Sequence, residues 1–120
     1  MFEKSRKQNA KIFVIGNGGS AVNASAMVND LGFDILKKTK KKSFNIISLS
    51  DNNAVSTAIS NDIGYENIFL SQIQMNYKKN DVVIVMSVSG NSKNLIKACN
   101  WVKKNNGYVF GILGCGGGKL

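Results

Sequence analysis

The sequence contains no histidine and no proline, and it has only two cysteines and seven acidic residues among 120. Without histidine, a metal site would have to use cysteine and carboxylate alone, and these residues show no ligand spacing. Two cysteines do not make the disulfide framework of a small secreted protein. Because no proline linker, repeat or low-complexity tract divides the chain, we expect a single domain over residues 1–120.

Long apolar runs are also missing, since none approaches the ~20 residues that span a bilayer. The segment Met1–Lys7 is charged and lacks the apolar core of a signal peptide. With 43% hydrophobic and 19% charged residues, the composition is typical of a globular protein. These features predict a cytoplasmic protein with no membrane partner.

The net charge of +9 raises the question of nucleic-acid binding, and the basic residues are densest at Lys37–Lys42. No aromatic residues that could stack on bases are interleaved with this run. It falls between a helical pattern and an expected strand, where a solvated connecting loop is the ordinary explanation. Nucleic acid is therefore the weakest of the partners considered.

Apolar runs alternate with segments of helical spacing along the whole chain. We expect strands at 12–15, 44–49, 81–86 and 108–113, and helices at 20–31, 54–60, 65–77 and 93–104. Cys99 lies on the apolar side of the last helix and is expected in the core, whereas Cys115 falls in a Gly-rich loop. The alternation predicts an α/β fold, a three-layer α/β/α sandwich with a parallel sheet.

The most informative segment is the Gly-rich loop Gly16–Ser20, which joins an apolar strand to a helix. The first turn of a helix has unpaired N–H groups and a positive dipole end, so a Gly-rich loop at that point favours an anion such as phosphate. The loop matches neither the P-loop nor the dinucleotide fingerprint. A flexible turn between two core elements is the alternative.

Further polar stretches follow the other expected strands, at 50–53, 87–92 and 114–118. In an open parallel sheet, ligands bind outside the carboxyl ends of the strands, which is where all four stretches should meet. Ser87, Ser89 and Ser92 surround a helix start, where hydroxyls and amides can share a phosphate without lysine. The alternative is that Ser92 or Asn91 only caps the helix.

Three carboxylates remain as candidates for acid–base work, namely Asp30, Asp51 and Asp62. Asp81 begins a strand and should lie at the opposite edge of the sheet, and Glu66 is expected on a solvated helix face. A solvated or capping role is the alternative for each candidate.

Through the motifs of these loops and helices, the chain resembles the sugar isomerase (SIS) domain, and within it the phosphoheptose isomerase group. The matching motifs, in the family's order, are Gly16–Ser20, Asn29–Leu31, Leu49–Asp51, Asn61–Phe69, Ser87–Ser92 and Gly117–Leu120. The resemblance implies isomerisation of sedoheptulose 7-phosphate to D-glycero-D-manno-heptose 7-phosphate, toward surface-heptose precursors. It also implies a homotetramer with sites at subunit interfaces.

The resemblance assigns roles to individual residues. Asp30 occupies the place of the catalytic carboxylate, which would move a proton between adjacent carbons through an enediol. The substrate-binding residues would be Asn17, Gly18, Gly19, Ser20, Asn61, Asp62, Ser87, Val88, Ser89 and Ser92.

The chain also departs from the family pattern. Ala26 stands where the family often has a histidine, and a leading helix, the last strand and the last helix have no counterpart here. We therefore expect no cofactor in this chain, with zinc possible only if a C-terminal extension supplies ligands. The alternative to an isomerase is a non-catalytic SIS module that senses phosphosugars or acts as a protein adaptor.

Overall fold

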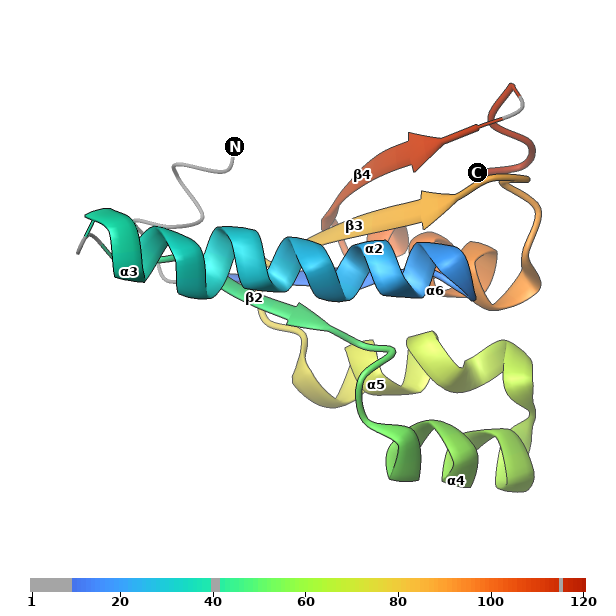
Figure 1. The fold of residues 1–120 in the computed structure, drawn as a ribbon. Helices are drawn as coiled ribbons and strands as arrows, with labels where there is room; N and C mark the ends of the chain where they lie inside the picture. The colour runs from blue at the N-terminus through green and yellow to red at the C-terminus, as the bar shows by residue number, and fades with distance from the viewer. Residues whose placement is uncertain (1–9, 40–41, 115) are drawn as a thin grey trace.

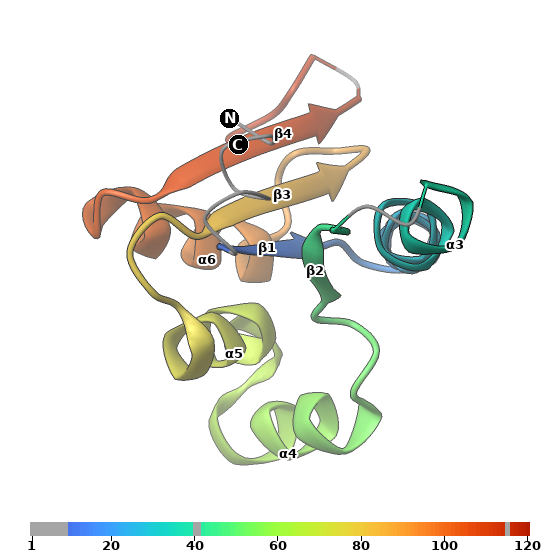
Figure 2. The same ribbon diagram turned by 90° about the vertical axis from the view of Figure 1, so that its left-hand side faces the viewer.

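A computed structural model describes residues 10–39, 42–114 and 116–120. Its four strands are β1 (Lys11–Ile15), β2 (Asn45–Ser48), β3 (Val82–Ser87) and β4 (Tyr108–Leu113). They form a parallel sheet in the order β2-β1-β3-β4 (Figures 1 and 2). The helical elements are α2 (Gly19–Val28), η1 (Asn29–Asp34), α3 (Ile35–Thr39), α4 (Asn53–Ile63), η2 (Tyr65–Asn67), α5 (Ile68–Asn76) and α6 (Lys93–Lys104).

Helices cover both faces of the sheet, which confirms the predicted three-layer α/β/α sandwich. Helices α5 and α6 pack on the face that carries Phe13 and Val83, while α2 packs on the face that carries Val14 and Ile84. Figure 2 shows the two layers on opposite sides of β1 and places α4 outside α5. Every residue of β3 is buried, as expected for a central parallel strand.

The first helix is longer than predicted. Figure 1 shows α2, η1 and α3 as one continuous helix, so the expected end at Leu31 and the expected loop at Lys37 and Lys38 are wrong. The middle part, η1, is a π-helix, in which a wider turn accommodates an extra residue. In α3 the Lys37 ammonium lies 3.7 Å from the Asp34 carboxylate, and Lys37 and Lys38 stand near the helix C-terminus, where cations are favoured.

Helix α4 is also longer than its predicted range of 54–60. It begins after Asn52, whose Oδ1 accepts the N–H of Val55 at 3.1 Å, and it continues to Ile63. Asn61 and Asp62 therefore lie in its last turn rather than in a loop, and the chain turns only at Gly64. By contrast, α6 and β4 have the predicted bounds.

Cys99 is 2% exposed and lies in the core between α6 and the sheet, as expected. Burial raises the pKa of its thiol to about 11, so the group remains protonated and unreactive at neutral pH. Cys115, Lys40 and Lys41 lie outside the described residues. Within the described ranges, no helix is long and apolar enough to cross a membrane.

Asp81 joins β1 to β3 at the amino end of the sheet, as its position in the sequence predicts. Its carboxylate, 2% exposed, accepts the N–H groups of Lys11 and Lys78, each at 2.8 Å. The Lys11 ammonium lies 3.0 Å from the same carboxylate. We call these groups the ionic clasp (Asp81, Lys11 and the N–H of Lys78).

Candidate functional site

A cleft of about 720 Å³ opens at the carboxyl ends of β1 and β3. Its described lining residues are Asn17, Gly19, Ser20, Val22, Asn23, Met86, Ser87, Val88, Ser89, Ser92 and Leu95. Seven of the ten residues predicted to bind substrate are among them. The structure thus brings the Gly-rich loop and the serine turn to the two sides of one cleft, which we call the sheet-end cleft.

The Gly-rich loop passes close to β3 before α2 begins. A Cβ on Gly16 would lie 2.9 Å from Ser20 Cβ and 3.1 Å from the Met86 carbonyl oxygen, so only glycine fits this approach. Gly18 is the N-cap of α2 with φ 55°, a conformation that favours glycine. Because Gly18 has no side chain, it offers no capping oxygen to the first N–H groups of α2.

The serine turn, Ser87–Ser92, forms the other side of the sheet-end cleft. Ser87 Oγ accepts the N–H of Gly90 at 2.9 Å, and Ser89 Oγ accepts the N–H of Asn91 at 3.2 Å. Ser92 occupies the N-cap position of α6, but its side chain makes no capping hydrogen bond. The capping alternative is therefore wrong for the Ser92 hydroxyl, which lines the cleft instead.

The C-terminal residues brace this turn from a side other than the cleft. The carbonyl of Gly90 accepts the N–H groups of Lys119 and Leu120, each at 2.9 Å, while Asn91 Oδ1 accepts from Lys119 at 3.0 Å. Gly90 has φ 69°, and a Cβ there would collide with the Gly117 carbonyl. The fourth predicted loop therefore shapes the turn, although none of its described residues lines the sheet-end cleft.

The electrostatic character of this cleft follows from its two helices. Both α2 and α6 present their N-termini to it without a side-chain cap, whereas α4, which does not border it, is capped by Asn52. No carboxylate is among the described lining residues. Two positive dipole ends and hydroxyl donors without a nearby negative charge make a site for an anion.

A hydrogen-bonded group of side chains connects the two sides. Asn17 Nδ2 donates to Asn94 Oδ1 at 3.0 Å, and Asn94 Nδ2 donates back to Asn17 Oδ1 at 3.0 Å. The Tyr65 hydroxyl donates to the same Asn17 Oδ1 at 3.0 Å. We call these three residues the amide clasp.

Four of the predicted site residues are not among the residues that line the sheet-end cleft: Gly18, Asp30, Asn61 and Asp62. Asp30 is exposed on η1, where Asn29 Nδ2 donates to its Oδ1 at 3.4 Å. Asn61 and Asp62 are exposed in the last turn of α4 and bond to each other at 3.2 Å. Tyr65, which follows α4 by two residues, connects this part of the chain to the Gly-rich loop through its hydrogen bond to Asn17.

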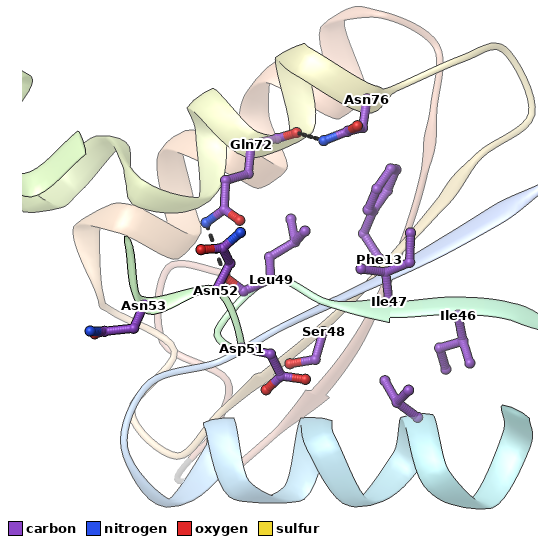
Figure 3. A pocket seen from close by; sticks show the side chains of 11 residues that line it. Phe13, Ile46, Ile47, Ser48, Leu49, Asp51, Asn52, Asn53, Gln72 and Asn76 are labelled. Carbon is purple, nitrogen blue, oxygen red and sulfur yellow. Dashed lines mark hydrogen bonds between the residues drawn. The ribbon is translucent and has the colours of Figure 1, made fainter. Parts of the chain in front are cut away.

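The remaining acid–base candidate, Asp51, lies in a different cleft of about 620 Å³ along β2. Figure 3 shows Asp51 and Ser48 on the side of β2 that faces α2, with Gln72 and Asn76 of α5 on the other side. Asp51 Oδ1 accepts the Ser25 hydroxyl at 2.6 Å, a bond that ties α2 to the loop after β2. In this geometry the Asp51 carboxylate holds the loop after β2 against α2.

Prediction from the sequence missed Asn94 and the role of Tyr65. A signal for Asn94 was present, because it lies one turn before Ala98 and beside Leu95 on the apolar side of α6. A polar residue buried at 2% exposure on such a face requires a hydrogen-bond partner. The sequence did not reveal that this partner is Asn17, 77 residues away.

A family profile described as "SIS domain" matches residues 1–114. The chain belongs to the SIS domain family. The phosphoheptose isomerase of Leptospira biflexa is 40% identical over 116 residues, and that of Helicobacter pylori is 39% identical over 114. These matches cover 97% and 95% of this chain but 60% and 58% of the relatives, so the chain spans about three fifths of their length.

A solved structure supports the same conclusion about the fold. A phosphoheptose isomerase from Francisella tularensis superposes with a TM-score of 0.90 at 26% identity, covering 99% of this chain and 61% of that one. The arrangement of the strands and helices described above is therefore that of a SIS domain.

The zinc that the family resemblance raised does not fit the described residues. Among them, no three His, Cys, Asp or Glu side chains gather into a group that could hold a metal ion. One helical turn before Asp30 stands Ala26, which has no donor atom. Asp30 alone is an insufficient donor set for the four-coordinate site that zinc prefers.

Proposed function

We propose that the sheet-end cleft binds the phosphate of a sugar phosphate. The observation that carries this proposal is the meeting of two uncapped helix N-termini with the serine turn in a cleft whose described lining has no carboxylate. A phosphate would accept N–H groups from the first turns of α2 and α6 and hydroxyls from Ser20 and Ser92. Gly18, Gly19, Val88 and Ser89 would shape the wall around it.

We further propose that the protein is a phosphoheptose isomerase, which converts sedoheptulose 7-phosphate to D-glycero-D-manno-heptose 7-phosphate. Its similarity to proteins of that name supports the substrate class. The anionic substrate does not diffuse through a bilayer, and the proposed location is the cytoplasm. Asn61 and Asp62 would contact the sugar, because Tyr65 holds their corner beside the Gly-rich loop.

The reaction moves protons and leaves the composition of the sugar unchanged. A base removes a proton from C1 of the ketose while O2 gains a proton, which gives the 1,2-enediol. A proton is then delivered to C2, and O1 loses its proton as the C1 aldehyde forms. We assign the base to Asp30.

The position of Asp30 makes this assignment depend on assembly. Asp30 follows Gly19 by 11 residues along one helix, a separation of roughly 16 Å. A phosphate held at the start of α2 therefore places the sugar far from Asp30 of the same chain. We propose that Asp30 reaches the cleft of a second copy, within a homo-oligomer that the resemblance suggests is a tetramer.

The test is proton exchange at the sugar. The chain is incubated with sedoheptulose 7-phosphate in D2O, and NMR follows deuterium at C1 and appearance of the aldose. We expect both signals in the wild-type chain. In Asp30→Asn, the rates of deuterium exchange and of aldose formation should be at least about 100-fold lower, as for removal of a general base. Asp34→Asn is the matched control, because Asp34 lies on the same π-helix with its own ion pair to Lys37.

Three other outcomes would contradict parts of the proposal. Exchange at the wild-type rate in Asp30→Asn would remove the assignment of the base. Binding of the sugar phosphate without exchange would contradict the isomerase and favour a non-catalytic SIS module. No binding at all would contradict the phosphate site itself.

A further inference from the structure

The amide clasp connects the two sides of the sheet-end cleft through side chains that sequence prediction did not place together. Asn17 belongs to the Gly-rich loop after β1, Asn94 to the first turn of α6 after β3, and Tyr65 to η2. Asn94 is 2% exposed, while Tyr65 is 58% exposed. The clasp therefore extends from the protein interior to the surface beside the cleft.

The hydrogen bonds define the orientation of Asn17. Its Oδ1 accepts from both Asn94 Nδ2 and the Tyr65 hydroxyl, each at 3.0 Å, which uses both lone pairs. Its Nδ2 donates to Asn94 Oδ1 at 3.0 Å and keeps one N–H. A carboxamide with three of its four positions engaged cannot rotate without breaking the pairing.

This fixed side chain controls the backbone beside it. The carbonyl of Asn17 accepts the N–H of Ser20 at 3.0 Å, and the carbonyl of Gly18 accepts the N–H of Ala21 at 3.0 Å. These bonds form the first turn of α2, and they fix the position of the helix N-terminus beside the cleft. Gly18 and Gly19 have open space around them, so their own contacts do little to hold this turn.

We propose that Asn94, assisted by Tyr65, is a positioning residue for the phosphate site, an inference that rests on the proposed function. The clasp holds the Gly-rich loop at a fixed separation from the serine turn, so both sets of donors are in place before the anion arrives. Binding then loses less conformational entropy than it would with a free loop. The clasp achieves this with neutral groups, which do not repel a phosphate.

The first experiment measures amide hydrogen exchange in the ligand-free 120-residue chain. Asn94→Ala should raise the exchange rates of the Ser20 and Ala21 amides about 10-fold, because these amides are hydrogen-bonded within the loop and opening of the loop no longer has to break the clasp. Tyr65→Phe should raise them about 3-fold. It deletes one hydroxyl from an exposed side chain, so it tests the proposal even if Asn94→Ala does not fold.

The matched control is Gln72→Leu. Gln72 is likewise a buried amide, at 6% exposure, but its Nε2 donates to the carbonyls of Leu49 and Ile68, away from the sheet-end cleft. This variant should lower the melting temperature and leave exchange in the Gly-rich loop unchanged. If the role of Asn94 were only structural, Asn94→Ala and Gln72→Leu would change hydrogen exchange in the Gly-rich loop to the same extent.

The second measurement is calorimetric titration with inorganic phosphate and with sedoheptulose 7-phosphate. We expect affinity about 10-fold weaker in Asn94→Ala, about 3-fold weaker in Tyr65→Phe and unchanged in Gln72→Leu. Wild-type exchange and affinity in Tyr65→Phe and in folded Asn94→Ala would overturn the proposal. If the wild-type chain binds neither ligand, the proposed function is wrong, and the exchange rates still decide whether Asn94 holds the loop.

Discussion

Side-chain contacts connect strands β1 and β3 at both of their ends, and the two sets of contacts use different chemistry. At the amino end, the ionic clasp centres on a buried carboxylate that accepts two backbone N–H groups and an ammonium. At the carboxyl end, the amide clasp pairs two neutral side chains and a phenol. Both connect residues that are 70 or more positions apart.

The difference follows from what each end has to accommodate. The ionic clasp satisfies its own donors with a full negative charge, and charge-assisted bonds are stronger than neutral ones. A carboxylate at the other end would compete for the N–H groups of α2 and α6 and repel an anion. The fold thus has a charged link at the amino end of the sheet and a neutral link at the carboxyl end, where the proposed anion site lies.

The largest effect should come from neutralising the ionic clasp. Asp81→Asn removes the charge and places an amide NH₂ against backbone donors, so the free energy of unfolding should fall by about 3 kcal/mol in urea titrations. Phosphate affinity should remain unchanged, because Asp81 lies at the far end of the strands. A loss below about 0.5 kcal/mol, as expected of the control Asp34→Asn with its partly exposed pair, would contradict this account.

The converse substitution should weaken both binding and stability, because it also removes the N–H that Asn94 donates to Asn17. Asn94→Asp keeps the shape of the side chain and introduces a negative charge beside the sheet-end cleft. Phosphate affinity should fall by about 10-fold, or about 1.4 kcal/mol, at low ionic strength and recover partly as salt is added. Asn100→Asp on the exposed side of α6 is the control. An equal loss of phosphate affinity in both variants would mean that the effect comes from the net charge of the protein and not from the position of Asn94.

The smallest effect concerns pH. Burial, with the charge of Asp81 second and Tyr108 third, raises the pKa of Tyr77 from 10.0. The folded state therefore keeps a proton that the unfolded state loses, and this contribution is present below pH 10 and lost as pH rises through the raised pKa. Tyr77→Phe should make unfolding in urea less sensitive to pH above 10, and an identical pH dependence would contradict the assignment.

Much of the fold could be predicted because its signals are local. The apolar run before Ser87 predicts a strand buried on both faces, and α6 has a serine at its start and Asn106 with positive φ at its end. Seven of the residues that line the sheet-end cleft were predicted to lie together, since parallel strands bring their carboxyl ends to the same edge of the sheet.

Other features could not be predicted because they depend on tertiary contacts. The π-helix includes Gly32, which local propensity disfavours within a helix, and the carbonyl of Leu31 is stabilised by the N–H of Phe44 beyond the helix. The amide clasp pairs residues that are distant in sequence. The separation of Asp30 from the cleft, by contrast, already follows from the predicted helix at 20–31, which begins at the Gly-rich loop and contains Asp30.

The extra residue in η1 has a consequence for the rest of that helix. Each residue of an α-helix advances the side chains by about 100° around the axis, so one residue inserted into a regular α-helix would shift the phase of everything after it, whereas the wide turn of the π-helix absorbs that residue. Phe33 and Leu36, at 58% and 52% exposure, lie in or beyond the wide turn. Deleting a single residue there would remove the wide turn and leave a regular α-helix in which the residues after η1 keep their present orientation.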